Sequence, residues 1–304
     1  MDNREKLDKL RGRTNQKGQD VVMYSYKMSE HDHYNQHELK RLEHSISSLR
    51  EFNNEIPVYL FCDDTTFIPN HFWDKYAVKL KRFQEGFNSD MLNAWSIHRW
   101  YNMKYFENKE CNILYLDSDT IFYGDVQYLF DTYCYFDIYG REEFGFRYDP
   151  NTGGGSNIRE QLDAVDLAIY ELGGKSEVYK YCLGVVLLNN NVHKYIIKEL
   201  DDLSNLMEMF KKNEIILPIP NPRIVDEFAV WILFSRLDLL GSLFAIQDVT
   251  QGWIEEKHRE YFNPVLLHYT TKKEQEFAKS DEKYANLIRD VDDLGEEIDP
   301  YHVL

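Results

Sequence analysis

The order of hydrophobic and polar residues along the chain predicts an alternation of strands and helices. Short apolar, β-branched runs predict strands, and apolar residues three or four positions apart predict amphipathic helices. The predicted strands cover residues 20–28, 56–62, 111–116, 135–139, 144–148, 181–190 and 264–268. The predicted helices cover residues 37–52, 71–84, 91–106, 192–211 and 228–237. Because the series opens with strand, helix and strand, it favours an α/β fold with a mainly parallel central sheet flanked by helices.

The stretch 111–125, CNILYLDSDTIFYGD, combines a buried strand with candidate chemistry. Its unbroken apolar run is typical of a strand buried on both faces, and Asp117 and Asp119 follow at the carboxyl end. Ligands of open α/β sheets bind beyond this end, where two carboxylates suit a divalent cation. Most Asp-x-Asp pairs are solvated loop acids, but buried carboxylates need a cation or hydrogen bonds. A calcium loop is excluded because Ile121 and Phe122 replace its required oxygen ligand and glycine.

This stretch resembles the DXD region of nucleotide-sugar glycosyltransferases with the GT-A fold. The resemblance is carried by the residues 114–120, LYLDSDT, followed by Gly124-Asp125 and Leu129-Phe130. It is greatest to family 8, the glycogenin and bacterial galactosyltransferase type. The resemblance implies a manganese (Mn²⁺) or magnesium (Mg²⁺) ion on Asp117 and Asp119, with Ser118 also beside the donor. That ion would bridge the two phosphates of a UDP-sugar and neutralise the departing diphosphate.

The same resemblance assigns donor-binding roles to residues earlier in the chain. Tyr24, Ser25 and Tyr26 end the first predicted strand, near which the nucleotide base would lie. Asp63 follows the second predicted strand, where it either hydrogen-bonds the pyrimidine or caps a turn. Arg99 precedes the first acid of the DXD motif by 18 residues, and the family carries an Arg at about this distance, close to the diphosphate. Its planar fork suits phosphate or carboxylate, although an exposed surface arginine is the alternative.

A second apolar run, PVLLH, ends in His268, and a His at this place is the third metal ligand in family 8. Neutral imidazole binds manganese alongside carboxylates, so the resemblance implies a site made by two acids and His268. The family continues with Gly and Lys where this chain has Thr271 and Glu274. The lysine that binds the diphosphate is therefore displaced to Lys272 or Lys273, or is absent.

Two further segments resemble the family in part. The strand 181–190 matches the pattern N-x-G-V-x-L-x-N at Gly184, whereas Cys182 replaces the Asn. Asp226 and Glu227 stand at the start of a predicted helix, where acids often serve only as caps. The family places an Asp-Gln or similar pair here, beside the sugar and acceptor. Asp226 and Glu227 are therefore candidates for acceptor binding or transition-state support.

Length, charge and cysteine usage limit the organisation and the partners. The 304 residues suffice for one large domain, which we expect at 20–273, between an arm at 1–19 and an acidic helix or tail at 274–304. The net charge of −17 disfavours nucleic acid, although basic residues in the arm allow a weak contact with a membrane surface. Four cysteines without CxxC spacing, and the lack of a signal-peptide or membrane-spanning segment, favour a cytoplasmic protein.

The sequence thus predicts a metal-dependent glycosyltransferase that uses a nucleotide-diphosphate sugar and an acceptor hydroxyl. If family 8 is the relative, the anomeric configuration is retained. The three-glycine segment 149–157 lacks the spacings of a P-loop or Rossmann motif, and it is either a lid over the sugar or an ordinary loop. A sugar nucleotidyltransferase would need a Gly-rich loop after the first strand, and residues 24–30 contain no Gly. A non-catalytic nucleotide-sugar or glycan-binding module stays open as an alternative.

Overall fold

The computed structural model describes residues 18–26, 32–62, 66, 68–82, 94–142, 158–175, 179–211, 225–251 and 264–268. Several predictions concern residues outside these ranges: the strand at 144–148, the glycine-rich segment 149–157, and the tail at 274–304. Asp63 and Lys272 also lie outside them. The described ranges contain the central sheet, helices on both of its faces and the acids of the DXD motif.

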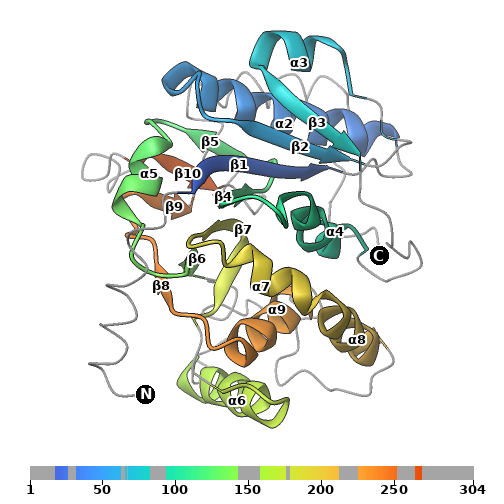
Figure 1. Cartoon of the computed structure of the whole chain (residues 1–304), viewed down its shortest axis with the longest axis vertical. Helices are drawn as coiled ribbons and strands as arrows, with labels where there is room; N and C mark the ends of the chain where they lie inside the picture. Colours follow the sequence, from blue (N-terminus) through green and yellow to red (C-terminus); the bar gives the residue numbers. More distant parts are fainter. Residues whose placement is uncertain are drawn as a thin grey trace.

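A seven-stranded sheet forms the centre of the molecule (Figure 1). Its strands are, in spatial order, β3 (Val78–Arg82), β2 (Val58–Cys62), β1 (Gln19–Tyr26), β4 (Cys111–Leu116), β7 (Tyr181–Leu188), β6 (Ile138–Glu142) and β8 (Gly241–Leu243). Strands β1 to β4 run parallel, and β6 and β8 run parallel to each other. Only β7, among these strands, is antiparallel to its neighbours. The predicted α/β fold with a mainly parallel sheet is therefore confirmed.

Helices cover both faces of this sheet and enclose two hydrophobic cores. The described helices are α2 (Asp32–Phe52), α3 (His71–Tyr76), α4 (Ala94–Asn102), η1 (Met103–Phe106), α5 (Gln127–Thr132), α6 (Ile158–Glu171), α7 (His193–Lys198), α8 (Leu200–Lys211) and α9 (Val225–Arg236). Apolar residues of α2 and α5 join one core, and those of α4 and α6 to α9 join the other. In Figure 1, α2 and α3 lie beside strands β2 and β3, whereas α6, α8 and α9 lie on the β8 side of the sheet.

Strand β4 contributes to both cores, as its unbroken apolar run predicted. Ile113 and Tyr115 face the core that includes α4, and Leu114 and Leu116 face the core that includes α2. All four side chains are at most 3% exposed, so both faces of the strand are removed from water. The strand ends at Leu116, which leaves the DXD acids directly beyond its carboxyl end.

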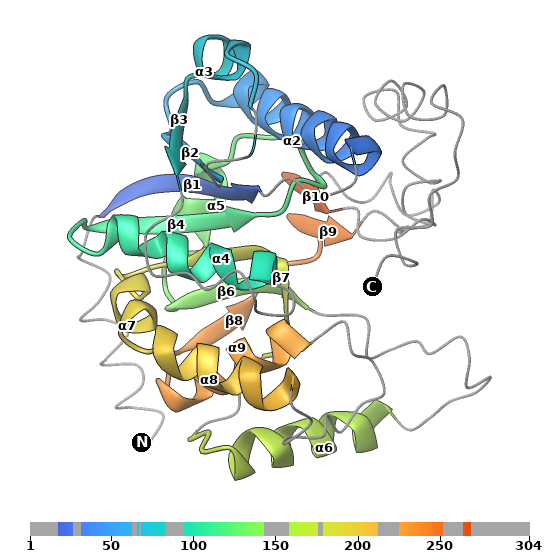
Figure 2. The ribbon, with the colours of Figure 1, turned by 90° about the vertical axis from the view of Figure 1, so that its right-hand side faces the viewer.

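A small second sheet lies beside the carboxyl ends of β1 and β4 (Figure 2). It consists of β5 (Thr120–Phe122), β10 (Leu266–His268) and β9 (Val249–Gln251), with β10 in the middle. Strand β10 is antiparallel to β5 and pairs His268 with Thr120. This pairing brings the second apolar run of the sequence next to the first.

The predicted helix at 71–84 is wrong beyond its first two turns. Helix α3 ends at Tyr76, Ala77 adopts a left-handed conformation with φ of 50°, and β3 follows at the edge of the sheet. The alternation of Val78 and Leu80 with lysines fits such an edge, because apolar side chains face the core while charges discourage further pairing. A helical interpretation overlooked this two-residue period.

Other predicted elements differ at their boundaries. The predicted helix 192–211 is divided at Glu199 into α7 and α8, and the predicted helix 91–106 ends as the 3₁₀ helix η1. The strand predicted at 135–139 begins only at Ile138. The termination of α2 at Phe52, before two asparagines, agrees with the prediction. No helix in the described part of the chain has both the length and the apolar character needed to cross a membrane.

Candidate functional site

Asp117, Asp119 and His268 converge beyond the end of β4. One ligand atom from each residue lies within 4.8 Å of the other two. The Nε2 atom of His268 is 3.1 Å from Oδ1 of Asp119. The imidazole is buried, whereas the side chains of Asp117 and Asp119 remain 30% and 21% exposed. In this cluster the imidazole is therefore shielded from solvent, whereas the two carboxylates are accessible to a ligand.

Strand pairing explains this convergence. The register between β5 and β10 places His268 opposite Thr120, one residue after Asp119. On the other side, the backbone N–H of Asp117 donates to the carbonyl of Gly184 at 2.8 Å, which continues the pairing of β4 with β7. Four strands thus meet at the acids: β4 and β5 on either side of them in the sequence, and β7 and β10 from two distant segments.

Gly184 provides the space that the cluster needs. A Cβ atom at this position would lie 2.6 Å from Nε2 of His268 and 2.9 Å from Oδ2 of Asp117. Both distances are shorter than real Cβ contacts, so a side chain here would displace the imidazole or the carboxylate. The glycine shared with the family 8 pattern is therefore required by packing against the two candidate ligands.

Arg99 and Tyr115 fix the orientation of Asp117. The Tyr115 hydroxyl donates to Oδ1 of Asp117 at 2.7 Å, and Nη1 of Arg99 lies 3.6 Å from the same oxygen. The Arg99 guanidinium lies 4.8 Å from the centre of the Tyr115 ring. Because Arg99 is only 3% exposed, the alternative of an exposed surface arginine is wrong. The buried positive charge instead lies next to the DXD motif.

The surroundings of Asp119 keep its carboxylate charged. Burial alone would raise the pKa of Asp119, but the electrostatic interaction and hydrogen bond with His268 and the nearby Arg41 hold this pKa below its usual value. An ionised carboxylate is the form that binds a cation. Together, the two acids and the imidazole form an oxygen and nitrogen donor set that suits Mn²⁺ or Mg²⁺.

Cys182 contacts the other side of the imidazole. Its Sγ atom lies 3.8 Å from Nδ1 of His268. The second nitrogen of a metal-binding histidine commonly donates to a carboxylate, a backbone carbonyl or a water, which fixes the ring orientation, and here a thiol occupies that place. The position where the family pattern has Asn therefore still faces the candidate site in this chain, but with a thiol.

A chain of hydroxyl groups supports the backbone of the DXD motif from the α2 side. Tyr24 bonds Ser45 at 2.8 Å, Ser45 bonds Thr120 at 2.7 Å, and Thr120 donates to the carbonyl of Asp117 at 3.0 Å. Sequence reasoning missed Ser45, which belongs to no recognisable motif, and it gave Thr120 no role of its own although this residue ends the stretch LYLDSDT. Tyr24 is 1% exposed, and burial raises its pKa, so its ring belongs to the packed interior.

The remaining predicted residues occupy different positions. Ser25 accepts a hydrogen bond from Asn102 at 3.1 Å, and Tyr26 beside it is 7% exposed. Ser118 lies between the two acids and is half-buried. Asp226 lies in the first turn of α9, but its side chain is outside the described part of the structure. The base contacts predicted for the end of β1 therefore stay predictions.

Glu227 is directed at strand β7. Its Oε1 atom accepts the backbone N–H of Leu183 at 3.1 Å. The carbonyl of Leu183 accepts a hydrogen bond from Nη1 of Arg99 at 2.8 Å. Glu227 and Arg99 thus hydrogen-bond the N–H and the carbonyl of Leu183, the residue that precedes Gly184.

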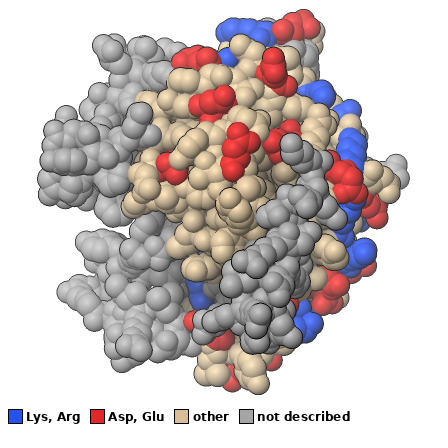
Figure 3. Space-filling model, turned by 60° about the vertical axis from the view of Figure 1, so that its left-hand side comes forward, with Lys and Arg blue, Asp and Glu red and all other residues tan. Residues whose placement is uncertain are grey.

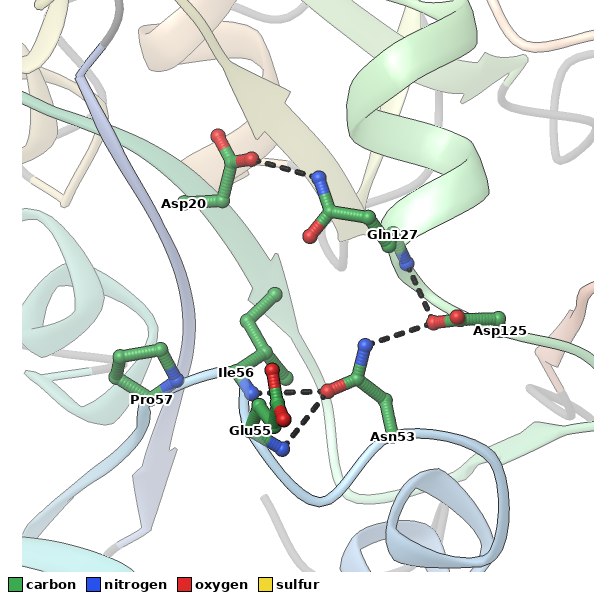
Figure 4. A pocket seen from close by; sticks show the side chains of 7 residues that line it. All are labelled: Asp20, Asn53, Glu55, Ile56, Pro57, Asp125 and Gln127. Carbon is green, nitrogen blue, oxygen red and sulfur yellow. Dashed lines mark hydrogen bonds between the residues drawn. The ribbon is translucent and has the colours of Figure 1, made fainter.

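A separate hollow of about 420 Å³ lies at the opposite edge of the sheet (Figure 4). It is lined by Asp20, Asn53, Glu55, Ile56, Pro57, Asp125 and Gln127. Gln127 donates to Asp20 and Asp125, and Asn53 donates to Asp125, so amides satisfy two of the three acids. Because Asp20 is near the start of β1 and Pro57 precedes β2, this hollow is remote from the DXD acids.

One side of the surface is conspicuously acidic. Figure 3, in which the α5 side of Figure 1 comes forward, shows Asp and Glu side chains scattered over an otherwise uncharged area, with Lys and Arg mainly at its edges. Such a face repels polyanions, in keeping with the net charge of −17.

The solved structures that match this chain include glycosyltransferases. The galactosyltransferase LgtC, in complex with donor and acceptor sugar analogs, matches with a TM-score of 0.53 and 13% identity over 92% of this chain and 98% of LgtC. GlyE from Streptococcus pneumoniae TIGR4 matches with a TM-score of 0.49 and 17% identity over 90% of this chain and 63% of GlyE. Mouse xyloside xylosyltransferase 1 matches with a TM-score of 0.47 and 12% identity over 82% of this chain and 97% of that chain.

The match to LgtC confirms the GT-A fold that the DXD resemblance predicted. At 13% identity, it is a likeness of fold alone. No protein-family model and no curated protein matches the sequence. Any inference about activity therefore depends on the side chains at the carboxyl edge of the sheet.

Proposed function

We propose that the protein is a metal-dependent glycosyltransferase, which moves a sugar from a nucleotide-diphosphate donor, a UDP-sugar, to an acceptor hydroxyl. The observation that carries this proposal is the convergence of Asp117, Asp119 and His268 at the carboxyl edge of a GT-A sheet. A sheet of this type binds ligands at that edge. The two carboxylates are partly exposed, which suits a cation that is shared with a ligand.

Asp117, Asp119 and His268 would hold Mn²⁺ or Mg²⁺, which supplies positive charge to neutralise the diphosphate as it leaves. The protein's own contribution is to fix the three ligands in advance. Tyr115 orients one oxygen of Asp117, and the buried imidazole is held between Asp119 and Cys182. Such preorganisation lowers the barrier because little rearrangement is needed during the reaction.

The rest of the donor and acceptor site follows the resemblance to family 8. We assign base contacts to Ser25, Tyr26 and Asp63, and the diphosphate contact to Lys272. Asp226, in the first turn of α9, is assigned to the acceptor side of the site. Retention of the anomeric configuration belongs to the same proposal, and positioning of the acceptor hydroxyl would supply much of the rate.

The test is a thermal-shift panel of nucleotide sugars, with and without Mn²⁺, on the wild type and on Asp119→Asn. A ligand that binds only the folded protein raises its melting temperature. We expect a shift for UDP-sugars that needs Mn²⁺ and is absent in Asp119→Asn. Asp201→Asn, which removes an exposed acid of α8, is the matched control and should behave as the wild type. An unchanged Mn²⁺-dependent shift in Asp119→Asn would show that the metal assignment is wrong.

Slow donor hydrolysis completes the test. With Mn²⁺, a glycosyltransferase releases free sugar and nucleoside diphosphate from its donor in the absence of acceptor. A non-catalytic binding module would give the thermal shift without either product. A sugar nucleotidyltransferase would instead convert the same donor and pyrophosphate into a sugar phosphate and a nucleoside triphosphate. The products therefore separate the proposed function from both alternatives.

A further inference from the structure

Strand β7 is irregular next to the candidate metal site. Its pairing with β6 runs regularly from Leu188 to Val186 and then jumps, so that the next paired residue is Cys182. Within this irregularity, the N–H of Leu183 donates to Glu227 at 3.1 Å, and its carbonyl accepts from Arg99 at 2.8 Å. Side chains from α9 and α4 therefore take over hydrogen bonds that a regular ladder would supply.

The irregularity positions Gly184, the next residue. Its carbonyl accepts the N–H of Asp117, and its Cα packs against His268 and Asp117 with no room for a Cβ. A small rotation of the Leu183 peptide would therefore change the separation of two candidate ligands. Metal sites are sensitive to such shifts, because bond lengths to the ion vary by only about 0.2 Å.

Arg99 contacts both the backbone of Leu183 and the carboxylate of Asp117. Its Nη1 atom bonds Leu183 and lies 3.6 Å from Oδ1 of Asp117. The guanidinium is 3% exposed, and a buried charge is retained only where fixed partners compensate for lost water. Both contacts come from Nη1, whose two N–H donors have directions fixed by the planar guanidinium, whereas the ammonium group of a lysine rotates freely on a flexible stem.

We propose that Glu227 and Arg99 are positioning residues, which clamp the Leu183 peptide so that Gly184 holds Asp117 and His268 at metal-binding separation. Glu227 thus acts through strand β7 and not as a carboxylate that touches the sugar. This inference rests on the proposed metal-dependent function, and it replaces the sequence-based role of Glu227 in acceptor binding or transition-state support.

The clamp requires a hydrogen-bond acceptor of the right length at position 227, and it does not require a negative charge. An amide oxygen can accept the N–H of Leu183 as a carboxylate does, so Glu227→Gln should retain the clamp. Glu227→Asp keeps the charge but shortens the side chain by one methylene, which withdraws the acceptor from Leu183. A carboxylate that reacts with substrate would give the opposite ranking, with Asp tolerated at least as well as Gln.

The experiment measures Mn²⁺ affinity by electron paramagnetic resonance, without nucleotide sugar, and donor hydrolysis in parallel. The series comprises the wild type, Glu227→Gln, Glu227→Asp, Glu227→Ala and Arg99→Lys, with Glu171→Ala as a control at an exposed acid of α6. We expect Glu227→Gln to stay within about threefold of the wild type in both measurements. Glu227→Asp, Glu227→Ala and Arg99→Lys should bind Mn²⁺ about 10- to 100-fold more weakly, as is typical when partners of metal ligands are removed.

The outcomes separate this inference from the proposed function. Wild-type Mn²⁺ affinity in Glu227→Asp, or loss of hydrolysis in Glu227→Gln with Mn²⁺ affinity intact, would overturn the clamp and make Glu227 a reacting carboxylate. If Glu227→Ala does not fold, the comparison of Gln with Asp still decides the question. Failure of the wild type itself to bind Mn²⁺ would overturn the proposed function and the clamp together.

Discussion

Gly184 and His268 pack so closely that a Cβ atom at position 184 would lie 2.3 Å from Cε1 of the imidazole. The contact joins residues from β7 and β10, which belong to two different sheets. The nearest atoms belong to a buried ring with little freedom to move, since His268 is 1% exposed. The bare Cα of Gly184 is therefore a condition for the arrangement of the candidate metal ligands.

Replacing Gly184 by Ala is expected to weaken Mn²⁺ binding by about tenfold or more, because the new methyl group displaces His268 from Asp119. The measurement is calorimetric titration with Mn²⁺. Gly124→Ala is the matched control, since the atoms nearest to its Cβ would belong to Val265, at an ordinary contact distance of 3.5 Å. Equal Mn²⁺ affinity in the two variants would contradict the packing argument.

Replacing Tyr115 by Phe should lower Mn²⁺ affinity about tenfold while changing stability by only about 1 kcal/mol. The variant loses the hydrogen bond of 2.7 Å that orients Asp117. Tyr76→Phe removes a similar hydrogen bond to Glu43, at 2.9 Å, on α3. That control should lose comparable stability but bind Mn²⁺ normally. A Tyr115→Phe protein with unaltered Mn²⁺ titration would refute the role given to this hydroxyl.

His193 is expected to make the protein less stable in mild acid. Burial lowers its pKa below the ordinary value of 6.5, although its hydrogen bond to the carbonyl of Phe106 opposes this shift. As the pH falls, the imidazole of the unfolded chain is protonated before that of the folded protein. The free energy of unfolding is therefore unaffected above pH 6.5. It then falls as the pH drops from 6.5 toward the lowered pKa, by at most about 1.4 kcal/mol per pH unit for one group.

Urea unfolding of the wild type and His193→Gln at several pH values between 5 and 8 checks this expectation. Below pH 6.5, the free energy of unfolding should fall less steeply in His193→Gln than in the wild type. The difference in this free energy between the two proteins therefore becomes smaller as the pH decreases. Other histidines titrate equally in both and cancel in the comparison. Parallel pH profiles would mean that His193 does not carry the effect.

Tyr181 and Gly241 should be energetically coupled in the core. The Tyr181 hydroxyl is buried without a hydrogen-bond partner in the described structure, and a Cβ on Gly241 would lie 1.9 Å from it. Tyr181→Phe removes an unsatisfied hydroxyl, so we expect a protein as stable as the wild type or up to about 1 kcal/mol more stable.

Gly241→Ala should be strongly destabilising in the wild type and less so in the Tyr181→Phe background, where the nearest ring atom is 3.2 Å from the new methyl group. A double-mutant cycle by chemical denaturation measures this coupling. The same loss of stability in both backgrounds would show that the hydroxyl does not restrict position 241.

Local patterns were sufficient to predict the elements that place the acids. The run before Asp117 predicted a strand buried on both faces, and β4 is such a strand, with its side chains divided between two cores. The spacing of apolar residues likewise predicted α2 and its end before Asn53. These inferences succeeded because burial imposes a period on neighbouring residues, and that period is visible in the sequence itself.

Only the tertiary structure decided which distant residues surround the acids. His268 is 149 positions from Asp119 and reaches it through the pairing of β10 with β5. A resemblance suggested that contact, but nothing local to His268 required it. The bonds of Arg99 and Glu227 to Leu183 had no sequence signal at all, because they depend on how α4, α9 and β7 pack. Side-chain contacts between separate elements depend on the whole fold, whereas the spacing of apolar residues within a single strand or helix can be read from the sequence.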